Sequence, residues 1–392
     1  MARLSKEELN KVKEQYGVDE LFSWSKVNTF MTSPYEYYLK YVLRKKEDAD
    51  NCAYAPMGSI CHTIIENLYE DEISYNDMVS EFEDGWLTTI NIADLKFDRN
   101  DESKNENIKS KYKDNLIHFF KNHNKIEDSI MLEKFIAVKI GDYVLQGYVD
   151  AIRKDKEGNY HIIDWKTSTK YTGEKLEEKS GQLCTYAIGL IQKGIPLEKI
   201  RICFNFLKYC TIEYEQANGK VKTRDVERYK IGESLQSNAK MWLKKLGYED
   251  KLDDYLMELL DTNDIKCLPK DVQEKYKITD CYIYQELTQK FIDKWTNEII
   301  VAIKDIKLRE KDYEETHSEK IWWDTEESVK KESYYFSTLC GYSPNLHKPY
   351  AEYLEKLEAS KSGDIFGGVS STTSKPIENK SSEIDLSWLD NI

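Results

Sequence analysis

Residues 143–166 read YVLQGYVDAIRKDKEGNYHIIDWK, two runs of β-branched and aromatic residues on either side of a polar turn. Apolar and polar positions alternate in both runs, and residues 154–159 contain the Asp, Gly and Asn that tight turns favour. The pattern predicts an antiparallel β-hairpin. Pairing Lys154 with Tyr160 across the turn places Asp150 opposite Asp164.

Two acidic residues and a lysine share one face of this predicted hairpin. Opposed side chains lie about 4.5 to 5.5 Å apart at Cβ, so Asp150 and Asp164 would repel unless a cation lies between them. Alternation puts Lys166 on the face of Asp164 and turns Trp165 toward the core. Carboxylates of this kind hold Mg²⁺ or Mn²⁺, and a lysine stabilises the negative charge that develops in phosphodiester hydrolysis. The alternative for such a pattern alone is a solvated charged face.

Three other segments carry related patterns. Residues 58–62 read GSICH at the start of a predicted helix, residues 182–186 read QLCTY on another, and residues 23–37 form an N-terminal SWSKVNTFMTSPYEY segment. Together with GYVD at 147–150 and IIDWKT at 162–167, they resemble the motifs of the PD-(D/E)XK nuclease superfamily, in its RecB-like and AddB-like exonuclease branch. These motifs occur in the family's order, from about residue 22 to about residue 210.

The resemblance implies an α/β fold: a restriction-endonuclease-like core with a mixed central sheet flanked by helices, with helical insertions and C-terminal helices added. It also implies roles for particular residues. The catalytic residues would be Asp150, Asp164 and Lys166. The metal ligands would be His62, Asp150, Asp164 and the carbonyl of Trp165. Gln182 and Tyr186, one helical turn apart on one face, would hold the DNA strand.

The residues alone suggest a support for His62. Glu66 follows it by one helical turn, so it shares a helix face with His62 and is placed to accept the second ring proton. A surface histidine with a glutamate four residues later is the alternative.

The chain departs from the family at one point. Several RecB-like nucleases bind an iron–sulfur cluster through a cysteine in the N-terminal segment and three cysteines near the end. Here Ser33 stands at the first position, and Cys340 is the cysteine near the expected end, with His347 beyond it. We therefore expect no iron–sulfur cluster, and Cys340 with His347 gives too few ligands for zinc. The eight cysteines contain no CxxC pair and are expected to be reduced thiols.

Composition limits the classes of protein that need considering. The net charge is −14 and 40% of the residues are hydrophobic, without an apolar run long enough to span a bilayer. Residues 1–6 lack the apolar stretch of a secretory signal, so we expect a cytoplasmic protein, in a bacterial or host cell, that has no membrane partner. No GxxxxGK[ST] motif occurs, which argues against a nucleoside triphosphate as a ligand. The acidic balance does not exclude DNA, because local basic residues and bound metal decide affinity.

The predicted organisation has five parts. Residues 1–70 form N-terminal helices with the GxxxH motif, 71–130 a helical insertion, 131–230 the catalytic core, and 231–359 a helical region. Residues 360–392 form a Ser- and Gly-rich tether that ends in an acidic segment, 383–392, around Trp388. This segment is expected to dock on a protein partner, and an end without function is the alternative.

The sequence therefore predicts a Mg²⁺- or Mn²⁺-dependent deoxyribonuclease. An exonuclease or flap-type activity on single-stranded DNA or duplex ends is expected from the RecB-like motifs, in DNA recombination, repair or replication. The compact chain without a motor fits a phage or mobile element. The alternatives are a catalytically inactive DNA-binding or scaffold subunit and a site-specific endonuclease. Intact Asp150, Asp164 and Lys166 favour the enzyme over the scaffold.

Overall fold

The computed structural model describes residues 3–49 and 52–366. The chain divides into two units. Unit 1 comprises Met1–Leu21 and Cys52–Asn297, and unit 2 comprises Phe22–Asn51 and Glu298–Ile392. No helix among the described residues is both long and apolar enough to cross a membrane. The predicted docking segment, 383–392, lies outside the described residues.

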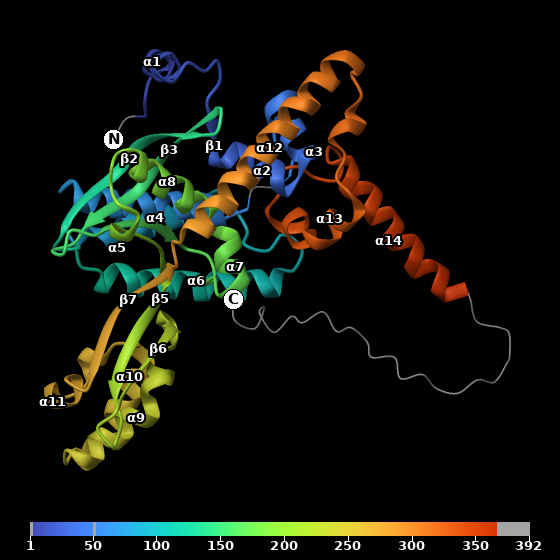
Figure 1. Cartoon of the computed structure of the whole chain (residues 1–392). Helices are drawn as coiled ribbons and strands as arrows, with labels where there is room; N and C mark the ends of the chain where they lie inside the picture. The colour runs from blue at the N-terminus through green and yellow to red at the C-terminus, as the bar shows by residue number, and fades with distance from the viewer. Residues whose placement is uncertain (1–2, 50–51, 367–392) are drawn as a thin grey trace, which may run out of the picture. The chain divides into compact units, whose positions relative to one another are not determined.

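A mixed β-sheet forms the centre of unit 1 (Figure 1). Strand β3 pairs antiparallel with β2 and β4, β4 pairs parallel with β5, and β5 pairs antiparallel with β6 and β7. The strands are β2 (Ser129–Ile140), β3 (Tyr143–Lys154), β4 (Tyr160–Lys166), β5 (Ile200–Glu215), β6 (Val221–Glu227) and β7 (Tyr276–Gln285). This sheet and its flanking helices confirm the predicted α/β fold.

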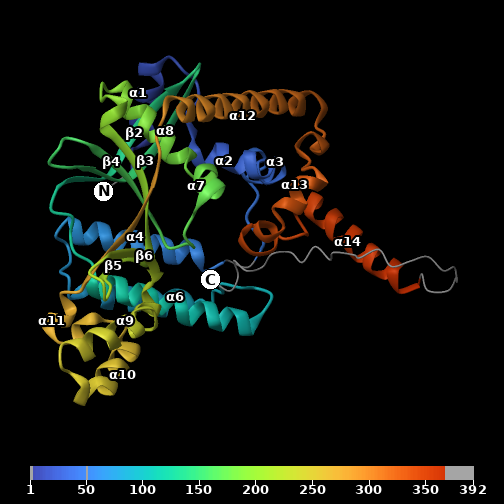
Figure 2. The same cartoon turned by 60° about the horizontal axis from the view of Figure 1, so that its bottom comes forward.

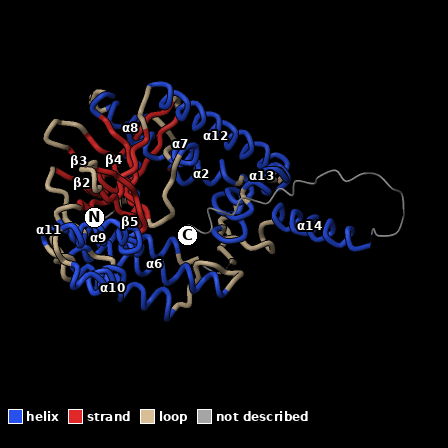
Figure 3. The backbone as a smooth tube through the Cα atoms, turned by 90° about the horizontal axis from the view of Figure 1, so that it is seen from below, coloured by secondary structure: helices blue, strands red, loops and turns tan. Residues whose placement is uncertain are grey.

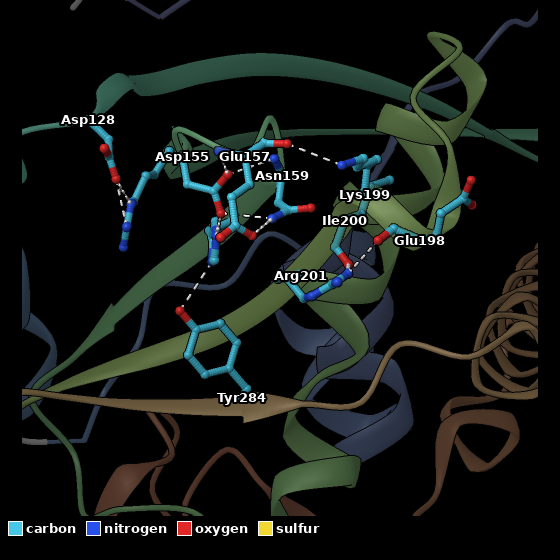
Figure 4. Close-up of polar contacts among 11 residues, drawn as sticks. Asp128, Asp155, Glu157, Asn159, Glu198, Lys199, Ile200, Arg201 and Tyr284 are labelled. Carbon is cyan, nitrogen blue, oxygen red and sulfur yellow. Dashed lines mark hydrogen bonds and ion pairs between the residues drawn. The ribbon is translucent and has the colours of Figure 1, made fainter.

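The predicted hairpin forms with the predicted pairing near its turn, and the expected pair of Asp150 with Asp164 lies just beyond the end of the ladder. Lys154 pairs with Tyr160, and the ladder runs to the pair of Ala151 with Ile163. The side chain of Asp155 closes the turn by accepting hydrogen bonds from the backbone N–H groups of Glu157 and Asn159 (Figure 4). Because this turn is short and its side-chain contacts are local, the sequence determines which residues of the two strands face each other.

Helices cover both faces of the sheet. Figures 2 and 3 show α8 (Gly181–Gln192) on one side and α6 (Glu102–Asn122) on the other, with α4 (Tyr54–Tyr69) beside α6. Helix α8 is apolar on nearly all sides, and most of its residues are buried. It also connects β4 to β5, and a parallel strand pair requires such a crossover. The remaining helices of the N-terminal half of unit 1 are α1 (Lys6–Tyr16), α5 (Asp77–Trp86) and α7 (Gly173–Lys179).

Strand β5 continues beyond the sheet as a ribbon with β6 and β7 (Figure 1). Helices α9 (Ile231–Lys245), α10 (Leu252–Thr262) and α11 (Lys270–Gln273) belong to this extension, which has an apolar core that includes Leu235, Trp242 and Leu259. The sequence-based expectation of a helical region from 231 onward was wrong for β7. Its alternation of Tyr276, Ile278 and other β-branched or aromatic residues is a strand pattern.

Unit 2 is built from two distant parts of the sequence. The N-terminal part contains β1 (Phe22–Ser23), α2 (Trp24–Thr32) and α3 (Pro34–Tyr37), and the C-terminal part contains α13 (Glu326–Lys331) and α14 (Lys348–Phe366). Helix α12 (Gln289–Thr316) begins in unit 1 and ends in unit 2. The rings of Tyr37 and Tyr38 stack on Trp322, with centroids 5.5 and 5.9 Å away. These aromatic contacts join the two parts of unit 2.

Candidate active site

The candidate site lies where β3 and β4 separate. Asp150 directly precedes Ala151, whose pair with Ile163 is the last in the hairpin ladder away from the turn. The Oδ2 atom of Asp150 accepts a hydrogen bond from the backbone N–H of Trp165 at 3.1 Å. Asp164 is 5% exposed, and its Oδ2 lies 2.6 Å from Nζ of Lys166. The structure thus brings together the two carboxylates and the lysine that the sequence predicted as catalytic.

Helix α4 adds His62 to this group. Nε2 of His62 lies 2.9 Å from the carbonyl oxygen of Trp165, and Nδ1 lies 3.6 Å from Oδ2 of Asp150. The imidazole ring meets the indole of Trp165 edge-on. All four predicted metal ligands therefore lie together, although β3, β4 and α4 are far apart in the sequence.

The charges of this group favour a bound cation. Burial, followed by the neighbouring Asp164 carboxylate, raises the pKa of Asp150 well above its ordinary value. Burial acts against the ammonium of Lys166, but Asp164 holds the pKa of this lysine above its usual range. Apart from that ion pair, the buried Oδ2 of Asp164 accepts no hydrogen bond. Two carboxylates thus share one ammonium group, an imbalance that a divalent cation would relieve.

The donor set fits a hard cation. Two carboxylates, one carbonyl and one imidazole offer mainly the oxygen ligands that Mg²⁺ and Mn²⁺ prefer. Among the described residues, no three His, Cys, Asp or Glu side chains already surround a common ion position. The donors instead contact one another, as His62 does with Trp165 and as Lys166 does with Asp164. Binding an ion would exchange these internal contacts for metal bonds.

Two further acids surround Asp150. Burial and the neighbouring Glu133 raise the pKa of Glu66 to about 7, against the opposing effect of His62. The nitrogens of His62 face Trp165 and Asp150 in the described contacts, so the support of His62 by Glu66 stays a prediction. The sequence analysis missed Glu133. It lies in β2 between residues that pair with Ala151 and Val149, hence opposite Asp150, and its φ of 43° is unusual for a non-glycine residue.

Helix α8, which carries the QLCTY sequence with Gln182 and Tyr186 (the QxxxY motif), also contacts β3, the strand of Asp150. Oη of Tyr186 donates a hydrogen bond to the carbonyl oxygen of Tyr148 at 2.9 Å, and Nε2 of Gln182 donates to Oη of Tyr186 at 2.9 Å. Tyr186 is only 5% exposed. The predicted contact of these two side chains with DNA stays a prediction, and the described contacts of the tyrosine are with β3.

Unit 2 contains a second buried group of polar side chains. Oγ of Ser33 donates to Oδ2 of Asp324 at 2.8 Å and lies 3.1 Å from Nε2 of His347. Burial raises the pKa of Asp324 to about 7 and lowers the pKa of His347 to about 4. Near neutral pH the imidazole is therefore uncharged and the carboxyl is about half protonated. Ser33 is thus occupied by hydrogen bonds within unit 2.

Comparison with known proteins shows the family of this chain. Residues 21–307 match the family description PD-(D/E)XK nuclease superfamily. A search of curated proteins gives no match. The matched residues include β2, β3, β4, α4 and α8, which carry the residues described above at the candidate site. This chain therefore belongs to the PD-(D/E)XK nuclease superfamily.

Proposed function

We propose that the protein is a Mg²⁺- or Mn²⁺-dependent deoxyribonuclease that uses Asp150, Asp164 and Lys166 for catalysis. The observation that supports this most directly is the convergence of two carboxylates and a lysine where β3 and β4 separate. Nε2 of His62 lies 2.9 Å from the Trp165 carbonyl oxygen and its Nδ1 lies 3.6 Å from Oδ2 of Asp150, which supports a role for His62 and this carbonyl beside the carboxylates.

Each residue has a distinct task in this proposal. Asp150, Asp164, His62 and the carbonyl of Trp165 would hold a divalent cation, which when bound would supply polarisation of the scissile phosphate and a lower pKa for an attacking water molecule. Asp164 also fixes the ammonium of Lys166, which stabilises negative charge developing on the phosphate and orients the attacking water.

The mode of cleavage is also part of the proposal. We infer an exonuclease or flap-type activity on single strands or duplex ends, acting in DNA recombination, repair or replication, because the motifs resemble those of RecB-like nucleases. Gln182 and Tyr186 are proposed to act beside the scissile strand, with Glu66 supporting His62. A cytoplasmic site of action, a phage origin and a protein partner for residues 383–392 complete the proposal; these rest on the sequence alone.

A digestion time course tests the proposal. Single-stranded, linear duplex and closed circular DNA are incubated with Mg²⁺ or Mn²⁺, with the linear substrates labelled at either the 5′ or the 3′ end. We expect linear DNA to shorten from its ends while closed circles resist. Discrete fragments from the circles would indicate the site-specific endonuclease instead. DNA binding without cleavage under every metal condition would indicate the inactive scaffold.

A further inference from the structure

A chain of hydrogen bonds connects helix α8 to the strand that carries Asp150. Gln182 donates to the hydroxyl of Tyr186, and this hydroxyl donates to the carbonyl of Tyr148, each at 2.9 Å. The hydroxyl of Tyr186 therefore has both a donor and an acceptor within the protein, and the ring is 5% exposed. Asp150 follows Tyr148 by two residues on β3.

Gly147 allows the ring of Tyr186 to lie this close to β3. A Cβ atom at position 147 would lie 2.8 Å from Oη and 2.9 Å from Cε1 of Tyr186, closer than real Cβ contacts allow. Any other residue would push the ring away from β3. The glycine of the GYVD motif and the tyrosine of the QxxxY motif are thus two halves of one contact.

The contact lies where β3 leaves β4. The hairpin ladder stops at the pair of Ala151 with Ile163, so residues 147–150 have no described ladder pair with β4, and their described contact with β4 is the hydrogen bond from the Trp165 N–H to the Asp150 side chain. A strand that leaves its neighbour has backbone groups that need other partners. The hydroxyl of Tyr186 satisfies the Tyr148 carbonyl, while the side chain of Tyr148 accepts a hydrogen bond from the backbone N–H of Leu4 at 2.6 Å.

We propose that Tyr186 is a positioning residue that sets the place of Asp150 by holding the Tyr148 carbonyl through the space left by Gly147. This inference rests on the proposed function, because it assigns Asp150 to the metal site. It gives the tyrosine an indirect task, acting on the metal ligand through β3. A direct contact of the hydroxyl with the DNA strand is the competing role. Loss of the hydroxyl lowers Mn²⁺ affinity if Tyr186 positions Asp150, and lowers DNA affinity if it contacts DNA.

The substitution Tyr186→Phe separates them, since it removes the hydroxyl and keeps the buried ring. We expect the affinity for Mn²⁺, measured by calorimetry without DNA, to fall about tenfold, as for other groups that orient metal ligands. The cleavage rate at subsaturating Mn²⁺ should fall in parallel and recover as Mn²⁺ is raised. Affinity for a single-stranded oligonucleotide, measured in Ca²⁺, should stay within about twofold of wild type.

Tyr342→Phe is the matched control. Tyr342 is 1% exposed, and its hydroxyl donates to the carbonyl of Lys45 at 3.0 Å within unit 2. This variant loses the same kind of buried hydrogen bond, so its stability should fall by a similar amount. Its Mn²⁺ affinity should match wild type, which distinguishes a positioning role from general destabilisation.

Gly147→Ala tests the same contact from the side of β3. It should lower Mn²⁺ affinity as Tyr186→Phe does, and the double variant should lose less than the two single losses combined, because both changes break one interaction. Gly189→Ala is the control, placed on α8, the helix that carries Tyr186. A Cβ there would meet the side chains of Ile136 and Val138 rather than Tyr186.

Unchanged Mn²⁺ affinity in Tyr186→Phe would overturn the inference, and reduced DNA affinity with normal Mn²⁺ affinity would assign the hydroxyl to the DNA strand. If Gly147→Ala does not fold, Tyr186→Phe still decides. Failure of the proposed function would look different, because wild type itself would then neither bind Mn²⁺ at this site nor cleave DNA.

Discussion

Two regions of the molecule each pair a histidine with an aspartate, and they differ in almost everything else. In the candidate site, His62 and Asp150 lie 3.6 Å apart with side-chain exposures of 26% and 15%. In unit 2, His347 and Asp324 lie 3.4 Å apart, and both side chains are fully buried. Residue types and spacing alone therefore do not distinguish a reactive group from a structural one.

The difference lies in access and in the balance of charge. Asp150 has a second carboxylate beside it, and the histidine and Lys166 remain partly open to solvent. Asp324 instead accepts a hydrogen bond from Ser33 and lies beside a neutral histidine, and burial, with a smaller effect of Glu36, favours its protonated form, so this group can become uncharged without an added ion. We infer that the candidate site, which has an excess of carboxylate and remains partly open to solvent at His62 and Lys166, binds metal and substrate, whereas the closed group of Ser33, Asp324 and His347 joins distant segments of unit 2.

The largest expected effect distinguishes the two regions by activity. Lys166→Ala removes the cation fixed by Asp164, and we expect cleavage of end-labelled DNA to fall about 10³-fold, as when a group that stabilises transition-state charge is lost. Lys277→Ala is the matched control, since this lysine is 68% exposed and pairs with Glu213 on the ribbon. Equal rates for Lys166→Ala and wild type would remove the lysine from the mechanism.

The second effect concerns stability. His347→Ala leaves a cavity and takes a neighbour from Ser33 and Asp324, so the free energy of unfolding should fall by about 2 to 3 kcal/mol. Urea denaturation measures this change. The cleavage rate per folded molecule should stay close to wild type, and a loss of activity without a loss of stability would contradict a purely structural role.

The third effect tests metal binding by His62 and Asp150, the histidine–aspartate pair of the candidate site. His62→Ala removes a predicted ligand, so Mn²⁺ affinity measured by calorimetry should fall about 10- to 100-fold. His161→Ala is the control within the same sheet, because His161 contacts Asp155 and Tyr284 near the hairpin turn. If both variants bind Mn²⁺ like wild type, His62 is not a ligand.

The smallest effect is a pH dependence of the closed group. Asp324 has a folded pKa of about 7 against 3.8 unfolded, so its stabilisation is full below about pH 3.8 and is lost as the pH rises through 7. His347 has a folded pKa of about 4 against 6.5, so its stabilisation is full above about pH 6.5 and is lost as the pH falls through 4. Between about pH 4 and 6.5 the two slopes cancel, since folding moves one proton from the histidine to the acid.

Asp324→Asn removes the contribution of Asp324 to the slope of the free energy of unfolding against pH and keeps that of His347. Relative to wild type, the free energy of unfolding of the variant should therefore rise between about pH 4.5 and 6.5, where His347 alone still titrates. Urea denaturation at both pH values measures the difference. Parallel pH profiles for variant and wild type would show that the acid does not take up a proton on folding.

The same comparison shows what could be predicted from sequence. The pairing from Lys154 with Tyr160 to Ala151 with Ile163 is set by a short turn, so the local pattern was enough to place Asp150 and Asp164 at the end of this ladder. The contact of Ser33 with Asp324 joins residues 291 positions apart, and no local pattern specifies such a pairing. Glu133 was missed for a similar reason, since its position opposite Asp150 depends on how β2 pairs with β3. Strand β7 was missed although its alternation was visible.

The most direct test compares two matched substitutions, Asp164→Asn in the candidate site and Asp324→Asn in the buried group of unit 2. Mn²⁺ binding and cleavage of an end-labelled single strand are measured on both variants and on wild type. We predict that Asp164→Asn loses Mn²⁺ binding and cleavage together, while Asp324→Asn keeps both. Normal cleavage by Asp164→Asn, or loss of Mn²⁺ binding by Asp324→Asn, would contradict the assignment of the metal-dependent site.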